Sequence, residues 1–273
     1  MTIYKALTIA GSDSGGGAGI QADLKTFQEL NVYGMSVITA LTAQNTLGVQ
    51  AVFPQSVEAV ESQIDAVMSD IGTDAAKTGM LFSKAIIEAV AKKVRKYQIN
   101  HFVVDPVMIA KSGATLLQEE AIEAMCEHLL PLALLITPNL PEAARLTGAE
   151  RIESIDDMKE AAKRLSEFGP KNVLIKGGHL GKDKKAIDIL YDGRQFFSFE
   201  SERIDTKHTH GTGCTYSAAI AAELAKGCAV DTAVGHAKQY MTFAIKYGLE
   251  IGKGIGPTNH SAHRTVAISK QEA

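Results

Sequence analysis

Apolar and polar residues follow two different periods along this chain. Short apolar runs such as 3–10 and 35–42 are typical of strands that are buried on both faces. Between such runs, apolar residues recur every three to four positions, as they do over 57–68 and 86–97, which is the period of an amphipathic helix. The two kinds of segment alternate through most of the sequence, and this order predicts repeated βαβ units.

Local signals bound the predicted elements. Ser56, Ser83 and Ser154 each precede a helical pattern as cap residues. The pair Asp192-Gly193 suits the tight two-residue turn of a hairpin. We expect strands over 3–10, 35–42, 75–78, 101–106, 132–137, 172–175, 186–191 and 195–199, and helices over 22–30, 57–68, 86–97, 118–129, 141–147, 155–168, 215–226 and 231–247.

These elements predict an α/β fold with three α/β/α layers. A central, mostly parallel sheet would be covered by helices on both faces, and the hairpin would lie at an antiparallel edge. The chain has 273 residues, of which 45% are hydrophobic, and it shows no internal repeat or low-complexity linker. We therefore expect a single domain over residues 1–273. The glycine-rich tail from Gly252 is expected to be loosely ordered.

Charge and cysteine content exclude several classes of function. The net charge is −3 and the Lys and Arg residues are scattered, so no nucleic-acid partner is expected. No apolar run approaches the roughly 20 residues of a membrane span, and from the residues at the start of the chain we expect no signal peptide. Cys126, Cys214 and Cys228 form no CxxC pair, which argues against a zinc site or a disulfide framework. Free thiols suit a reducing cytosol, so we expect a cytoplasmic protein.

A glycine-kinked turn runs directly into an alanine-rich helix over residues 208–220. Gly211 and Gly213 let a ligand approach the backbone amides, and the start of a helix attracts anions such as phosphate. Cys214 lies at that helix start, where the pKa of a thiol is lowered. The alternative is a tight loop with a small buried cysteine that packs as an apolar residue.

A second glycine-rich loop occupies residues 11–23. It matches neither GxGxxG nor a P-loop, so neither a dinucleotide fold nor a P-loop enzyme is supported. We expect its backbone to approach a small ligand, with Asp13 or Asp23 as polar contacts, and the alternative is a flexible surface loop. The polar segment 111–114 is a candidate lid, and we expect His208 and His210 to be solvated loop residues.

Polar side chains follow the C-terminal ends of several predicted strands. Gln44, Asp105 and Lys176 do so, as do Asn139 and Glu142. In open α/β sheets, ligands bind outside that edge, so these groups should converge on one crevice that faces the turn at 211–214. Phosphoryl transfer needs the groups that this crevice would contain: two carboxylates, an amide, a lysine and an anion-binding turn.

Each of these residues also has a purely structural interpretation. Asp105 precedes a proline and suits a turn. Asn139 and Glu142 flank a proline-led helix start, where capping is their common role. Lys176 before two glycines suits a solvated surface position, and Gln44 an ordinary loop. The functional interpretation therefore depends on their joint placement at strand ends.

Seven stretches of sequence carry a resemblance to a known family. The sequence resembles the ribokinase superfamily, and within it the hydroxymethylpyrimidine/phosphomethylpyrimidine kinases of the thiamin pathway, over roughly residues 3–260. Together the stretches are highly specific. They are Ala10–Ser14, Gly17–Asp23, Thr39–Thr46, Lys77–Met80, Val104–Val107, Thr137–Glu142 and Gly211–Cys214.

The resemblance implies a ribokinase-like fold, a homodimer and ATP-dependent phosphorylation of a small pyrimidine, 4-amino-5-hydroxymethyl-2-methylpyrimidine, and then of its monophosphate. ATP and Mg²⁺ are the implied cofactors. It also implies substrate contacts at Gln44, Asp23, Gly11, Ala18, Met80 and Val107; ATP contacts at Lys176, Asn139, Thr209 and Gly213; Mg²⁺ held directly or through water by Asp105 and Glu142; and a catalytic anion hole with its base at Gly211, Thr212, Gly213 and Cys214.

One position departs from the wider superfamily. The sugar kinases end the glycine motif in aspartate, whereas this chain has Cys214. A thiol with an ordinary pKa of about 8.5 is a workable base only if the helix start, and His210 beside it, lower that pKa. In the second phosphorylation the nucleophile is already a phosphate oxygen. We therefore expect Cys214 to matter more for the first step than for the second.

Two other functions fit parts of the same pattern. A pyridoxal or pyridoxine kinase of vitamin B6 salvage would share the fold and the cysteine, although the run at 43–46 favours the pyrimidine kinases. A non-catalytic sensor of a nucleotide or pyrimidine is the alternative from another class. The combination of Asp105, Glu142, Lys176 and Cys214 argues against a sensor, because a sensor needs no base.

Overall fold

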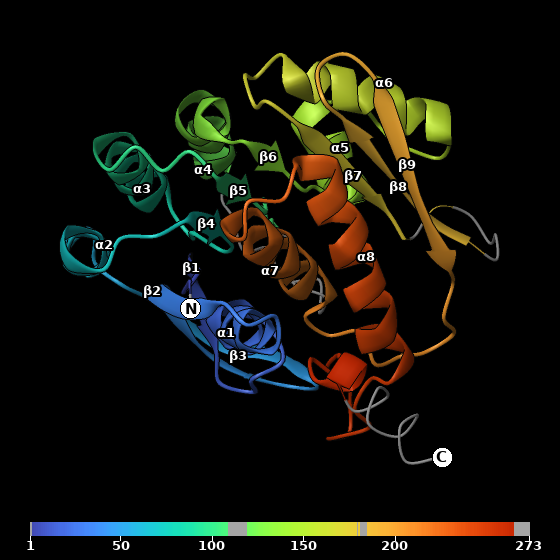
Figure 1. Ribbon diagram of the computed structural model, residues 1–273, viewed down its shortest axis with the longest axis horizontal. Helices are drawn as coiled ribbons and strands as arrows, with labels where there is room; N and C mark the ends of the chain where they lie inside the picture. The colour runs from blue at the N-terminus through green and yellow to red at the C-terminus, as the bar shows by residue number, and fades with distance from the viewer. Residues whose placement is uncertain (1, 109–118, 179, 181–184, 265–273) are drawn as a thin grey trace.

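The computed structural model describes residues 2–108, 119–178, 180 and 185–264, and the candidate lid at 111–114 lies outside them. Within these residues the chain builds one nine-stranded sheet, in the order β3-β2-β1-β4-β5-β6-β7-β8-β9 (Figure 1). The strands are β1 (Lys5–Asp13), β2 (Tyr33–Asn45), β3 (Gly48–Pro54), β4 (Ala75–Thr78), β5 (Phe102–Val104), β6 (Leu135–Ile136), β7 (Val173–Gly177), β8 (Lys185–Tyr191) and β9 (Phe196–Glu202).

Strand pairing confirms the expected mostly parallel sheet. β1 pairs in parallel with β2 on one side and β4 on the other, and parallel pairing continues through β5 and β6 to β7. β3, β8 and β9 are antiparallel additions at the two edges. The chain goes from β1 to β2 on one side and later returns to place β4 on the other side. Such a reversal opens a crevice at the carboxyl ends of the strands.

Helices cover both faces of the sheet, as the sequence predicts. One apolar cluster joins the sheet to α2 through α6, and a second joins the opposite face to α1, α7 and α8. Figure 1 shows α7 and α8 side by side across that second face. The helices are α1 (Gly19–Glu29), α2 (Val57–Asp70), α3 (Lys84–Lys96), α4 (Glu119–Ala124), α5 (Leu140–Thr147), α6 (Ile155–Ser166), α7 (Thr212–Ala225) and α8 (Val230–Lys246).

Alternation along the central strands explains why both faces are apolar. Val103 packs into the α7 and α8 cluster, whereas its neighbour Val104 packs into the α2 to α6 cluster. Leu135 and Ile136 divide in the same way. Successive side chains of a strand point to opposite faces, so a continuous apolar run is what a sheet covered on both sides requires.

The structure corrects three details of the sequence prediction. β3 was not expected, because it is an edge strand of mixed polarity whose residues are all at least partly exposed. The hairpin turn spans 192–195 rather than two residues, since Asp192 Oδ1 accepts hydrogen bonds from the backbone N–H groups of Arg194 and Gln195. The helix expected over 118–129 continues beyond α4 as a π-helical turn, Met125–Leu129.

The predicted loose tail is wrong over residues 252–264. The backbone N–H of Ile255 donates to the Thr46 carbonyl, and the N–H of Thr258 donates to the His210 carbonyl. The tail is therefore fixed against the end of β2 and against the turn that precedes α7.

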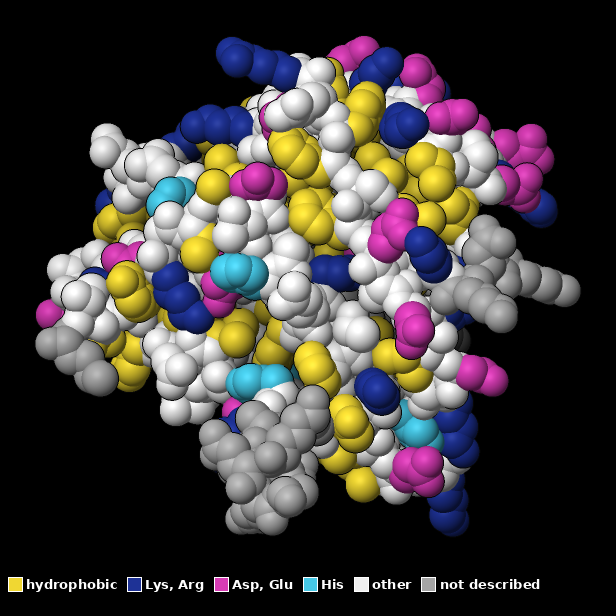
Figure 2. Space-filling view, turned by 45° about the vertical axis from the view of Figure 1, so that its right-hand side comes forward, with side chains coloured by type: hydrophobic (Ala, Val, Ile, Leu, Met, Phe, Trp, Pro, Cys, Tyr) yellow, Lys and Arg dark blue, Asp and Glu magenta, His cyan; other side chains and the backbone are white. Residues whose placement is uncertain are grey.

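The surface carries interspersed charges. On the face in Figure 2, Lys and Arg side chains alternate with Asp and Glu, and apolar side chains are visible between them. Within the residues that the structure describes, no helix is long and apolar enough to cross a membrane.

Candidate active site

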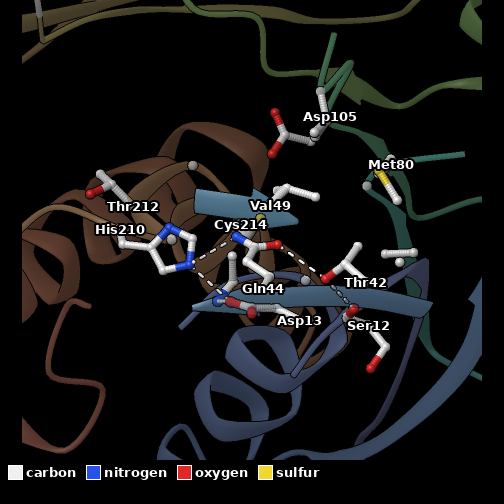
Figure 3. Close-up of a pocket in the computed structure, with 18 of the residues that line it drawn as sticks. Ser12, Asp13, Thr42, Gln44, Val49, Met80, Asp105, His210, Thr212 and Cys214 are labelled. Atoms are coloured by element: carbon white, nitrogen blue, oxygen red, sulfur yellow. Dashed lines mark hydrogen bonds and ion pairs between the residues drawn. The ribbon is translucent and has the colours of Figure 1, made fainter. Parts of the chain in front are cut away.

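One pocket collects most of the predicted site residues. It lies at the carboxyl ends of the parallel strands and faces the first turn of α7, as the positions of the strand ends predict (Figure 3). Thirteen of the residues that the resemblance implied line it: Gly11, Ala18, Gln44, Met80, Asp105, Val107, Asn139, Glu142, Lys176, Gly211, Thr212, Gly213 and Cys214.

Two implied residues do not line the pocket. Asp23 is fully buried beneath it, where its carboxylate pairs with Lys77 Nζ at 3.0 Å and accepts from Thr8 Oγ1 at 2.6 Å. The expected contact of Asp23 with a ligand is therefore wrong, because an internal lysine neutralises this carboxylate. Thr209 stays behind the turn, where its carbonyl accepts a hydrogen bond from Thr212 Oγ1 at 2.7 Å.

The turn before α7 has the expected form of an anion site. Gly211 has a φ of 80°, and a side chain there would collide with the carbonyl of Gly17, so the turn requires glycine. Among the described residues no side chain caps α7, and although the N–H of Thr212 donates to the Thr209 carbonyl at 3.3 Å, the N–H groups of Gly213 and Cys214 at this helix start have no side-chain acceptor. A Cβ on Gly213 would lie 3.6 Å from Lys176 Nζ and 3.8 Å from Asp105 Oδ2. The helix start therefore faces an ion pair directly.

Asp105 and Lys176 form that ion pair, with Nζ and Oδ1 2.9 Å apart. Thr137 Oγ1 donates to Oδ1 and Ser217 Oγ donates to Oδ2, each at 3.2 Å. Burial opposes ionisation, but the charges of Lys176 and Lys77 together with these hydrogen bonds hold the pKa of Asp105 below its ordinary value. Asp105 is therefore a carboxylate at neutral pH.

Asn139 and Glu142 both cap a helix and belong to the pocket, so the structural and the functional interpretation hold together. They form a capping box at the start of α5: Glu142 N donates to Asn139 Oδ1 and Asn139 N donates to Glu142 Oε2, both at 2.9 Å. Both also line the pocket. Lys176 lies beside them because its backbone bridges to Asn139. Burial, with the nearby charge of Asp105, raises the pKa of Glu142 despite the opposing charge of Lys176.

Cys214 differs from the expectation in its ionisation. Burial raises the pKa of its thiol to about 11, and the opposing charge of Lys77 does not compensate. His210 interacts with Asp13 and Gln44 instead of supporting the thiol. The expected lowering of the pKa of Cys214 is therefore wrong for this structure, because the cost of desolvating a thiolate exceeds the effect of the helix start.

The remaining wall of the pocket is largely apolar. A Cβ on Gly11 would lie 2.5 Å from Met80 Cε, so glycine is needed for the methionine to reach the cavity. Val107 has a φ of 37°, a conformation that is rare for a β-branched residue and that marks local strain. Gln44 is one of the polar groups that line the pocket, and it lies at the end of β2.

Sequence reasoning missed His210 as the partner of Gln44. His210 lines the pocket, and the expectation of solvated histidines at 208 and 210 is wrong, since the side chains are 10% and 15% exposed. Their position beside Gly211 was the available signal. Asp13, which the sequence offered as a possible polar contact, also lines the pocket and pairs with His210. Ser217, one turn into α7, was also missed as a partner of Asp105.

The protein is a ribokinase-like small-molecule kinase. This class is defined by a mostly parallel sheet with helices on both faces, an anion-binding helix start and a lysine–carboxylate pair in one crevice. The phosphomethylpyrimidine kinase family model matches residues 13–259. This chain belongs to that family.

Relatives and solved structures agree with this assignment. The chain is 54% identical over 269 residues to the hydroxymethylpyrimidine/phosphomethylpyrimidine kinase of Bacillus subtilis strain 168, covering 98% of this chain and 99% of the relative. It is 49% identical to the pyridoxine kinase of that strain, covering 97% and 98%. The crystal structure of an ADP complex of Bacillus subtilis pyridoxal kinase superposes with a TM-score of 0.90 at 48% identity, covering 97% and 100%.

Proposed function

We propose that this enzyme phosphorylates 4-amino-5-hydroxymethyl-2-methylpyrimidine, and then its monophosphate, in thiamin biosynthesis. The observation that carries the proposal is that one pocket joins Gln44, a group able to pair with an aminopyrimidine, to the anion site at the start of α7. Membership of the phosphomethylpyrimidine kinase family and the similarity to a hydroxymethylpyrimidine/phosphomethylpyrimidine kinase support the same reaction.

ATP is the proposed phosphoryl donor, as ligand-bound relatives support. Lys176 and Asn139 would contact its phosphates, because both line the pocket beside the anion site. The amides of the 211–214 turn would hold the transferred phosphoryl group, whose charge grows in the transition state. Together these groups position the donor in line with a hydroxymethyl group held near Gln44.

The donor set also fits Mg²⁺. Asp105 and Glu142 present carboxylate oxygens to the pocket, and each retains lone pairs beyond its present hydrogen bonds. Lys176 already occupies one side of Asp105, which favours an ion held mainly by phosphates and waters, as Mg²⁺ prefers. When bound, Mg²⁺ would neutralise charge on the phosphates of the donor.

Cys214 remains the proposed base of the first step, at the mouth of the anion site. At neutral pH its thiol is protonated, so only a small thiolate fraction would accept the hydroxyl proton. In the second step a phosphate oxygen attacks and needs no such acceptor.

A pyridoxal kinase is the second candidate, and the 49% identical pyridoxine kinase is the observation that favours it. Phosphorylation of hydroxymethylpyrimidine and of pyridoxal with Mg-ATP, with mono- and diphosphate products resolved, tests both. Diphosphate from the pyrimidine supports the thiamin assignment. Turnover of pyridoxal alone would establish the second candidate, and no turnover of either would contradict both and favour a sensor.

The Gln44→Ala variant tests the substrate end of the pocket. Loss of a positioned carboxamide should raise the KM for the pyrimidine about tenfold or more and leave the KM for ATP unchanged. An equal loss of both would contradict the assignment of Gln44. We further propose that residues 1–273 act as one cytoplasmic domain that forms a homodimer.

A further inference from the structure

A chain of hydrogen bonds connects the turn before α7 to Gln44, the proposed substrate-binding residue (Figure 3). Asp13 Oδ2 lies 2.8 Å from His210 Nε2, which in turn lies 3.3 Å from Gln44 Nε2. Gln44 Oε1 lies 3.1 Å from Thr42 Oγ1. Thr42 Oγ1 donates to the Ser12 carbonyl at 2.9 Å, where the chain ends.

Asp13 determines where the histidine carries a proton. Its carboxylate accepts the N–H groups of Gly15, Gly17 and Ala18 at 2.8 to 3.1 Å, and its pKa lies below its ordinary value because these bonds and His210 outweigh the effect of burial. An ionised carboxylate only accepts hydrogen bonds. His210 Nε2 must therefore carry a proton and donate to Asp13, and it has no lone pair for an amide N–H.

The proton on Nε2 then sets the orientation of Gln44. The carboxamide must then be turned over relative to Figure 3, so that its carbonyl oxygen and not its NH₂ group faces His210, because an amide N–H group there would meet the proton of Nε2. Thr42 has one hydroxyl proton, and Ser12 already accepts it. Thr42 Oγ1 is thus free to accept, which suits the NH₂ group of Gln44 in that same orientation.

We propose that His210 is a positioning residue for substrate recognition: it holds the Gln44 carboxamide with its oxygen toward the turn before α7 and its nitrogen toward Thr42. One N–H group and one oxygen lone pair of the Gln44 amide then remain free to bind a ligand in the pocket. A 4-aminopyrimidine has a ring nitrogen that can accept from this N–H group and, beside it, an exocyclic amine that can donate to this oxygen. This inference rests on the proposed function and deepens it.

Two substitutions separate positioning from bulk packing. His210→Gln places an amide N–H at the same number of bonds from Cα as Nε2, whereas His210→Leu keeps similar bulk without a donor. We expect Leu to raise the KM for the pyrimidine about tenfold and Gln to restore most of the loss, with the KM for ATP unchanged in both. Equal effects of Leu and Gln, or an equal rise in the KM for ATP, would overturn the proposal.

A double-mutant cycle and a spectroscopic measurement complete the test. Adding His210→Leu to Gln44→Ala should raise the KM for the pyrimidine no further, and additive effects would overturn the proposal. ¹⁵N NMR of the wild-type imidazole should show a proton on Nε2 of His210, and a ring protonated at Nδ1 alone would overturn it. The NMR result stands even if the wild-type enzyme fails to phosphorylate the pyrimidine, so failure of the proposed function remains distinguishable.

Discussion

At the scale of single residues, Cys214 as the proposed base is expected to control the pH dependence of the first phosphorylation. Its pKa of about 11 leaves about one thiolate in 10⁴ at pH 7. The base acts only when deprotonated, so kcat/KM of the first step should rise about tenfold per pH unit between pH 7 and 9. The second step should stay nearly flat, because its nucleophile is already charged.

Separate assays of the two steps on wild type and on Cys214→Ala check this expectation. The variant should lose most of the first activity together with its pH slope, and retain most of the second. An equal fall of both steps would remove Cys214 from the role of base.

The buried pair of Asp23 and Lys77 is expected to matter for stability rather than for binding. Both side chains are fully buried, so Lys77→Met would leave the carboxylate without its partner. We expect a loss of about 3–5 kcal/mol in the free energy of unfolding, measured with urea. Lys185→Met is the control: it breaks an exposed pair with Glu200 and should cost less than about 1 kcal/mol. Similar costs for the two variants would contradict this expectation.

At the scale of elements, two capping boxes provide a matched comparison. Asn139 caps α5 at the pocket, and Ser154 caps α6 outside the residues that line it. Replacing either by Ala should lower the free energy of unfolding by about 1 kcal/mol, as measured by chemical denaturation. Only Asn139→Ala should also raise the KM for ATP, since Glu142 and Lys176 depend on the start of α5. Loss of ATP affinity in Ser154→Ala would show a general effect of stability instead.

At the scale of the whole molecule, the edge formed by β2 and β3 is the expected dimer surface. Leu41 and Phe53 are register partners on this edge and are 45% and 58% exposed. Phe53→Asp should convert the proposed homodimer to a monomer, as measured by light scattering, because a charge would be buried in the contact. A wild-type protein that is monomeric at micromolar concentration would contradict the proposal, and a variant that remains dimeric would place the contact elsewhere.

Much of the architecture was predictable because its signals are local. Apolar runs such as 101–106 and 132–137 fall on β5 and β6, and the serine caps at 56, 83 and 154 begin helices as expected. β3 was missed because an exposed edge strand lacks a continuous apolar run. The turn at 192–195 is longer than the two residues that were predicted, because the Asp192 side chain accepts hydrogen bonds that stabilise a longer loop.

The sequence by itself determined the order of elements, the layers and the strand ends that carry polar groups. These features depend on the hydrophobic period, the capping residues and the chain direction, which are all properties of residues that are neighbours in sequence. The tertiary structure alone decided which polar groups meet. It removed Asp23 from the pocket by pairing it with Lys77, and it brought Asp13, His210 and Gln44 together from distant segments. It also raised the pKa of Cys214, because the cost of burying a charge depends on the surrounding packing rather than on local sequence.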